Sequence, residues 1–186
     1  MSAFEFLFSL FGLLLGLSIA ELAGGFSRLY DQRKVRPIGW LAPGLAAVLL
    51  LDLLTFWYGA WFFRRLELNF WLVLGAGIVG LLYYFAATQV FPREGSTVAG
   101  SDHVMEHRRP VVVVVIIANI IMFGPSFVLN ATRSGLGALD LIPASANLIY
   151  FALLGVMGFS PSRRWAGLAM VASPLLILGS VAVMGY

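Results

Sequence analysis

The sequence predicts an all-α fold: a single membrane domain built as a bundle of six transmembrane helices. Of its 186 residues, 60% are hydrophobic and only 11% are Asp, Glu, Lys or Arg, whereas a typical soluble domain is about 25% charged. The apolar residues also fall in long blocks, each close to the roughly 20 residues that cross a bilayer as a helix. The expected spans cover residues 4–30, 38–63, 69–91, 110–130, 141–159 and 164–186.

The first three spans follow from their apolar blocks. The first has no Lys or Arg before it and continues past the length of a signal peptide, so we interpret it as a retained span. The second carries Pro43 in its opening turn, where a proline is tolerated. The third aligns Gly77, Gly80, Tyr84 and Thr88 on one face, which we interpret as a packing seam.

A polar segment separates the third span from the fourth. Residues 92–109 include "REGSTVAGS", which is rich in Gly and Ser, so we expect a flexible loop there. The fourth span then begins at Pro110, a favourable residue for a first helical turn. The fifth span is short, and the sixth runs to the last residue.

The distribution of basic residues predicts the orientation. Nine of the twelve Lys and Arg residues lie in or beside the loops that follow the first, third and fifth spans. The positive-inside rule therefore places residues 31–37, 92–109 and 160–163 in the cytoplasm and both termini outside a plasma (cytoplasmic or inner) membrane. Because the basic residues mark span ends and form no stripe with interleaved aromatics, we expect the lipid bilayer as the partner and exclude nucleic acid.

Asp52 is the most informative residue, because "LLLDLLTFW" places it near the centre of the second span. A carboxylate at that depth costs about 2.5–3.5 kcal/mol on insertion scales. No Lys or Arg lies in the middle of any span. Asp52 should therefore be protonated, hydrogen-bonded to neutral groups or bound to a cation. Two interpretations of Asp52 are about equally supported by the sequence. One is a proton or cation site, and the other is a neutral acid that holds helices together.

Other polar features accompany Asp52. Glu21 lies in the first span with Arg28 two turns further on, within reach of a snorkelling side chain. The fourth span carries Asn119 and the break "FGPSF", where the proline should kink the helix and free carbonyls that need partners. The predicted polar pathway consists of Asp52, Glu21, Asn119, Gly124 and Pro125.

The first span also carries small residues at every fourth position. They are Gly12, Gly16, Ala20 and Gly24. Such a small-residue stripe allows a second helix to approach closely. We interpret it as a helix-packing surface, either within the bundle or toward a partner.

"HVMEH", residues 103–107, matches the inverted zinc-protease pattern H-x-x-E-H. His103, Glu106 and His107 are weak candidates for metal binding, because a catalytic zinc usually needs a third protein ligand. The chain has no other His, no Cys, and no Glu after Glu106. We therefore expect no metal site and no cofactor. The structural interpretation is a solvated helical turn that leads into the fourth span, and a loop that responds to pH or metal is the remaining functional interpretation of the two imidazoles.

The leading functional hypothesis is a small transporter or channel-like protein that handles protons, cations or a small solute at Asp52. The alternative is a non-catalytic accessory or assembly subunit that contacts another membrane protein, or a second copy, through the first span. A membrane-embedded enzyme with a lipid-like substrate ranks third, and the sequence favours a non-enzymatic role.

Overall fold

The computed structural model describes residues 3–34, 39–60, 69–92, 100–134 and 138–184. Its elements are α1 (Ala3–Asp31), the short 3-10 helix η1 (Gln32–Lys34), α2 (Leu41–Ala60), α3 (Phe70–Val90), α4 (Gly100–Ser134), α5 (Ala138–Phe159) and α6 (Arg163–Met184). The all-α fold class is confirmed, and no strand occurs among these described residues. Residues 35–37, 61–63, 93–99 and 185–186, which belong to predicted loops and spans, lie outside the described residues.

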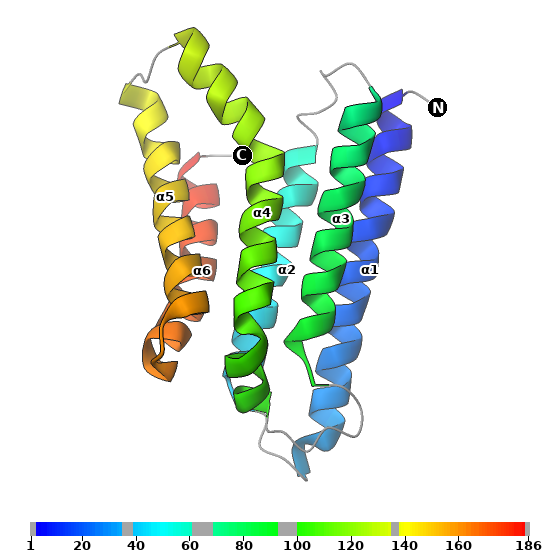
Figure 1. The fold of residues 1–186 in the computed structure, drawn as a ribbon, viewed down its shortest axis with the longest axis vertical. Helices are drawn as coiled ribbons and strands as arrows, with labels where there is room; N and C mark the ends of the chain where they lie inside the picture. Colours follow the sequence, from blue (N-terminus) through cyan, green and yellow to red (C-terminus); the bar gives the residue numbers. More distant parts are fainter. Residues whose placement is uncertain (1–2, 35–38, 61–68, 93–99, 135–137, 185–186) are drawn as a thin grey trace.

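The helices run along a common long axis and form two groups (Figure 1). On one side α1 packs against α3, and α3 packs against α4. On the other side α5 pairs with α6. The groups meet where α4 contacts α5 and where α2 contacts α6. The polar site described below lies at this junction.

The outer surface of the bundle is apolar. Five described helices are long and apolar enough to cross a membrane, and α5 adds a shorter apolar run, Ser145–Phe159. Many large apolar side chains around the bundle are exposed, and four of them are at least 59% exposed: Leu13, Leu81, Leu148 and Leu168. A water-soluble monomer rarely exposes so much contiguous apolar surface. The chain is a multi-pass helical membrane protein.

α1 and α3 approach each other closely at Gly80, one residue of the predicted seam on α3. A Cβ atom at Gly80 would stand 2.6 Å from the Cβ of Leu14, so no larger residue fits without a shift. The small-residue stripe of α1 behaves differently. No neighbouring atom lies within 4 Å of a Cβ placed at Gly16, and Ala20 is exposed. At these two positions the stripe is open on the surface of this chain.

The other two stripe residues have loose surroundings. A Cβ at Gly12 would lie 3.9 Å from the Trp57 ring of α2, and one at Gly24 would lie 3.4 Å from the Arg28 side chain of the same helix. Packing of the stripe against a partner therefore stays a prediction.

The predicted flexible loop at residues 92–109 is wrong in its second half, because residues 100–109 form the first turns of α4. Val104 and Arg108 are buried one turn apart, and His103 Nε2 lies 3.1 Å from the carbonyl oxygen of Gln89 at the end of α3. A short polar helix is marginal in isolation and gains its stability from tertiary packing. Composition alone could not reveal these contacts.

Two prolines lie inside α4. Pro110, predicted in the first turn, is instead in the helix interior. Pro125 follows Gly124 in the predicted break, yet the helix continues past it to Ser134. Figure 1 shows that this last part of α4 bends away from α2 and α3, toward the side of α5. A proline lacks the N–H that would bond one turn back, so it bends a helix here without ending it.

Arg108 joins α4 to the C-terminal end of α5. Its guanidinium donates from Nη1 to the Met157 carbonyl at 2.8 Å and from Nη2 to the Ser160 carbonyl. The side chain is only 3% exposed. The last carbonyls of a helix have no partner within it and carry partial negative charge, so an arginine satisfies them and complements the helix dipole.

We expect Arg108→Met to lower the free energy of unfolding by about 3 kcal/mol, because hydrogen bonds from a charged donor to buried carbonyls are lost. Arg109→Met is the matched control, since Arg109 is the exposed neighbour. The measurement is denaturant unfolding of both variants in detergent micelles. Equal stability of the two variants would contradict the capping role.

Candidate functional site

Asp52 lies on the buried face of α2. Val48, Leu49, Leu53 and Phe56 surround it on this helix and are at most 1% exposed, and Asp52 itself is 3% exposed. Nearly continuous apolar sequence on both sides fixes this segment as a span, and packing against α3 and α4 turns the carboxylate inward. The carboxylate therefore faces neighbouring helices and not the lipid.

Two neutral donors from other helices reach the Asp52 carboxylate. Tyr83 of α3 donates its hydroxyl to Oδ2 of Asp52. Asn119 of α4 donates from Nδ2 to the same oxygen at 3.1 Å, and Nδ2 also lies 3.2 Å from the Tyr83 hydroxyl and 3.0 Å from the Val115 carbonyl. Hydrogen bonds within a low-dielectric interior strengthen each other. Three helices thus meet at one carboxylate, and we call Asp52, Tyr83 and Asn119 the Asp52 cluster.

Aromatic rings hold the cluster in place on one side. The Phe56 ring contacts the Tyr83 ring edge-on, with centroids 4.9 Å apart, and contacts Phe123 of α4 in the same manner at 5.1 Å. Phe56 is completely buried. Such edge-to-face pairs are worth about 0.5–1.5 kcal/mol beyond area burial. They fix the Tyr83 ring and hence the position of its hydroxyl.

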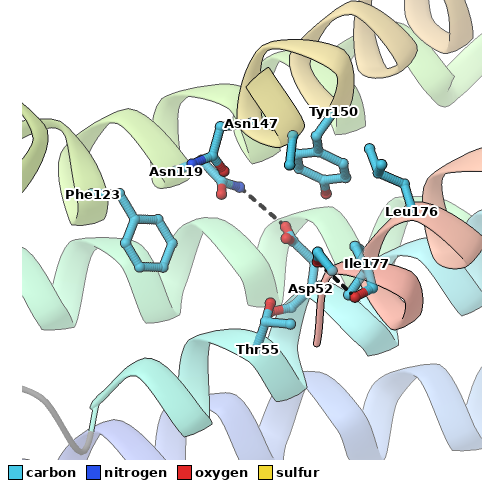
Figure 2. A pocket seen from close by; sticks show the side chains of 10 residues that line it. Asp52, Thr55, Asn119, Phe123, Asn147, Tyr150, Leu176 and Ile177 are labelled. Atoms are coloured by element: carbon cyan, nitrogen blue, oxygen red, sulfur yellow. Dashed lines mark hydrogen bonds between the residues drawn. The ribbon is translucent and has the colours of Figure 1, made fainter. Parts of the chain in front are cut away.

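A cleft of about 150 Å³ lies beside the Asp52 cluster, and Figure 2 shows Asp52, Asn119 and Tyr150 converging on it. α2 contributes Asp52 and Thr55, α4 contributes Asn119 and Phe123, α5 contributes Ala146, Asn147 and Tyr150, and α6 contributes Leu176, Ile177 and Ser180. We call it the polar cleft. Both groups of helices therefore line it.

The electrostatics of the polar cleft are those of an acid without a counter-ion. No Lys or Arg occurs among the described residues that line it. Tyr83 and Asn119, the hydrogen-bond donors to Asp52, are both neutral. Burial of an unpaired ion is expensive, so such an acid is protonated, holds a cation or depends on its neutral hydrogen-bond donors. A proton or a cation is therefore a candidate ligand of Asp52.

The structure brings together some of the predicted pathway residues and separates others. Asp52 and Asn119 are in direct contact, and Gly124 lines an adjoining cleft. Glu21 instead pairs with Arg28, as the spacing predicted, with Nη2 and Oε1 2.8 Å apart, and it does not line the polar cleft.

Sequence reasoning missed the two tyrosines of the site. On α3 it selected Tyr84, which is 40% exposed, whereas its neighbour Tyr83 is fully buried. Tyr150 on α5 was not considered. A tyrosine in the middle of an apolar span is a recognisable signal, because its hydroxyl needs a partner there. The neighbour that supplies the partner cannot be read from spacing along one helix.

The H-x-x-E-H residues do not assemble a metal site. The rings of His103 and His107 stack with centroids 4.1 Å apart, and His107 Nδ1 lies 3.1 Å from the His103 carbonyl oxygen. Glu106 is exposed. Among the described residues, no three His, Cys, Asp or Glu side chains gather where they could hold a metal ion.

Comparison of the chain with protein families, with curated proteins and with solved structures found no match. The function must therefore be argued from the site itself.

Tyr83→Phe should lower the free energy of unfolding by about 1–2 kcal/mol, because it removes one of the two donors to the buried Asp52 carboxylate. Tyr84→Phe, the same change at the exposed neighbouring position, should have no effect. Detergent unfolding curves measure both. In an Asp52→Asn background, Tyr83→Phe should lower the free energy of unfolding by less. An equally large decrease in that background would show that the two side chains are not coupled.

Proposed function

We propose that the protein is a small transporter or channel-like protein that passes protons, cations or a small polar solute through the polar cleft. One observation carries the proposal: a carboxylate buried at the centre of a span, bonded to neutral donors, beside a cleft of about 150 Å³. An intramembrane acid that faces a cavity is the usual mark of an ion or proton pathway.

The geometry supports a role for each member of the Asp52 cluster. Asp52 binds the proton or cation. Tyr83 and Asn119 hold the carboxylate in position, and their hydrogen bonds compensate its charge when the cargo leaves. Gly124 and Pro125 directly follow Phe123, which lines the polar cleft, so a change in the bend of α4 there would alter the opening of the cleft.

Asp52→Asn should abolish flux in proteoliposomes, because the amide cannot take up a proton or pair with a cation. The assay follows proton, Na⁺, K⁺ and methylammonium movement with the purified chain. Asp31→Asn is the matched control, since Asp31 is an exposed acid at the end of α1. Flux that is unchanged by Asp52→Asn would refute the proposed role of Asp52.

A second candidate function is an accessory or assembly subunit, and the small-residue stripe of α1 favours it. Gly16 has open space around it, and Ala20 is exposed. A close-packed helix from another membrane protein or from a second copy would fit there, because small residues let backbones approach.

In that case a membrane protein should co-purify with the chain, and Gly16→Leu should release it by blocking the close approach. Gly77→Leu is the control, since Gly77 of α3 also has open space around it but lies outside the stripe. Retention of the partner by Gly16→Leu, or its loss from both variants, would count against an interface at the stripe.

A further inference from the structure

The polar cleft adjoins a second cleft with a different lining. This apolar cleft, of about 220 Å³, lies between α4 and α5 and shares Asn119, Phe123 and Asn147 with the polar cleft. Its other lining residues are Ile120, Gly124, Leu148 and Phe151. Ile120 and Leu148 are 56% and 70% exposed on the outer surface of the bundle. The apolar cleft therefore opens sideways, toward the lipid.

Tyr150 supplies an independent sign of a ligand in the polar cleft. Its side chain is buried, with 7% exposure, and Figure 2 shows its hydroxyl directed toward the cleft. Among the described residues no partner meets the geometry of a hydrogen bond with this hydroxyl, although the Asp52 carboxylate lies close enough to interact with it. A buried hydroxyl without a partner is unfavourable. A bound polar group beside Asp52 would satisfy it.

The charged side chains in the two clefts determine which charge a bound polar group can carry. Asp52 is the acid in the lining, and no Lys or Arg lines either cleft in the described part of the chain. A phosphate, sulfate or carboxylate would face a like charge without compensation. A protonated primary amine has three donors, which suit the Asp52 carboxylate, the Tyr150 hydroxyl and Ser180.

The size of the clefts limits the ligand further. A cavity of about 150 Å³ holds a molecule the size of benzene, so a bulky lipid head group does not fit the polar cleft. The apolar cleft has room for about seven water-sized groups, which suits the first part of an unbranched alkyl chain. The rest of the chain can pass between Ile120 and Leu148 into the bilayer.

We propose that the site binds a single-chain amine amphiphile that enters from the membrane between α4 and α5. The ammonium group lies in the polar cleft against Asp52 and Tyr150, and the alkyl chain lies in the apolar cleft. This inference rests on the proposed role of the Asp52 site and names the class of molecule that the site takes.

Equilibrium binding of radiolabelled n-decylamine tests it, with the full chain in nanodiscs and empty nanodiscs subtracting the lipid background. We expect saturable binding of one n-decylamine per chain. Unlabelled n-decylamine should compete, while n-decyl sulfate and n-decanol should not. Absence of saturable binding, or equal competition by n-decyl sulfate, would overturn the proposal.

Two variants locate the molecule. Tyr150→Phe should weaken n-decylamine binding about tenfold, the loss of one hydrogen bond to a charged group, without lowering the melting temperature of the empty protein. Gly124→Leu should prevent binding by filling the apolar cleft. Gly155→Leu is its matched control, because Gly155 of α5 has open space around it and lines neither cleft. Unchanged binding in Tyr150→Phe and Gly124→Leu would refute this placement.

The outcomes separate this inference from the proposed function. Flux that depends on Asp52, without saturable n-decylamine binding, would refute the amphiphile site and leave the proposed transport function standing. Saturable binding without any flux that depends on Asp52 would support the amphiphile site and overturn transport.

Discussion

The Asp52 carboxylate is the constraint on which the arrangement of the helices depends. A buried acid with no basic partner is tolerated only where neutral donors reach it. The Tyr83 hydroxyl and the Asn119 amide do so from α3 and α4, so both helices must present one particular face to α2. The aromatic contacts of Phe56 follow from the same register. Apolar packing alone would leave the rotation of each helix far less determined, because lipid and side chains are equally apolar.

The spans could be predicted from sequence because the cost of exposing backbone to lipid forces each long apolar block into a helix. Helix ends that are set by contacts with other helices could not be predicted from sequence. The first ten residues of α4 are mostly polar, and they are helical because His103 meets the end of α3 and Arg108 caps α5. Gly- and Ser-rich composition before them pointed to a loop. The fold was therefore predictable inside the hydrocarbon region and much less so at its edge.

The candidate site was likewise predictable from sequence only in part. Asp52 and Asn119 could be selected individually, since polar atoms at membrane depth are rare and costly. Their direct contact, and the choice of Tyr83 over Tyr84, depend on how far each helix is rotated. One position along a helix corresponds to about 100° around it. Glu21 illustrates the opposite case: its partner Arg28 lies on the same helix, so sequence spacing was sufficient to predict the pair.

A purely structural role for the Asp52 cluster explains part of the geometry but not all of it. Polar groups that only hold helices together should satisfy one another in a close-packed interior. Asp52, Tyr83 and Asn119 meet that description. Tyr150 does not, because no partner among the described residues meets hydrogen-bond geometry with its buried hydroxyl, which faces the Asp52 carboxylate across a cleft that α5 and α6 help to line. Closing that cleft would improve packing at little cost, since most of its remaining lining is apolar. A binding role explains why the cleft stays open and why its unsatisfied group points toward the carboxylate.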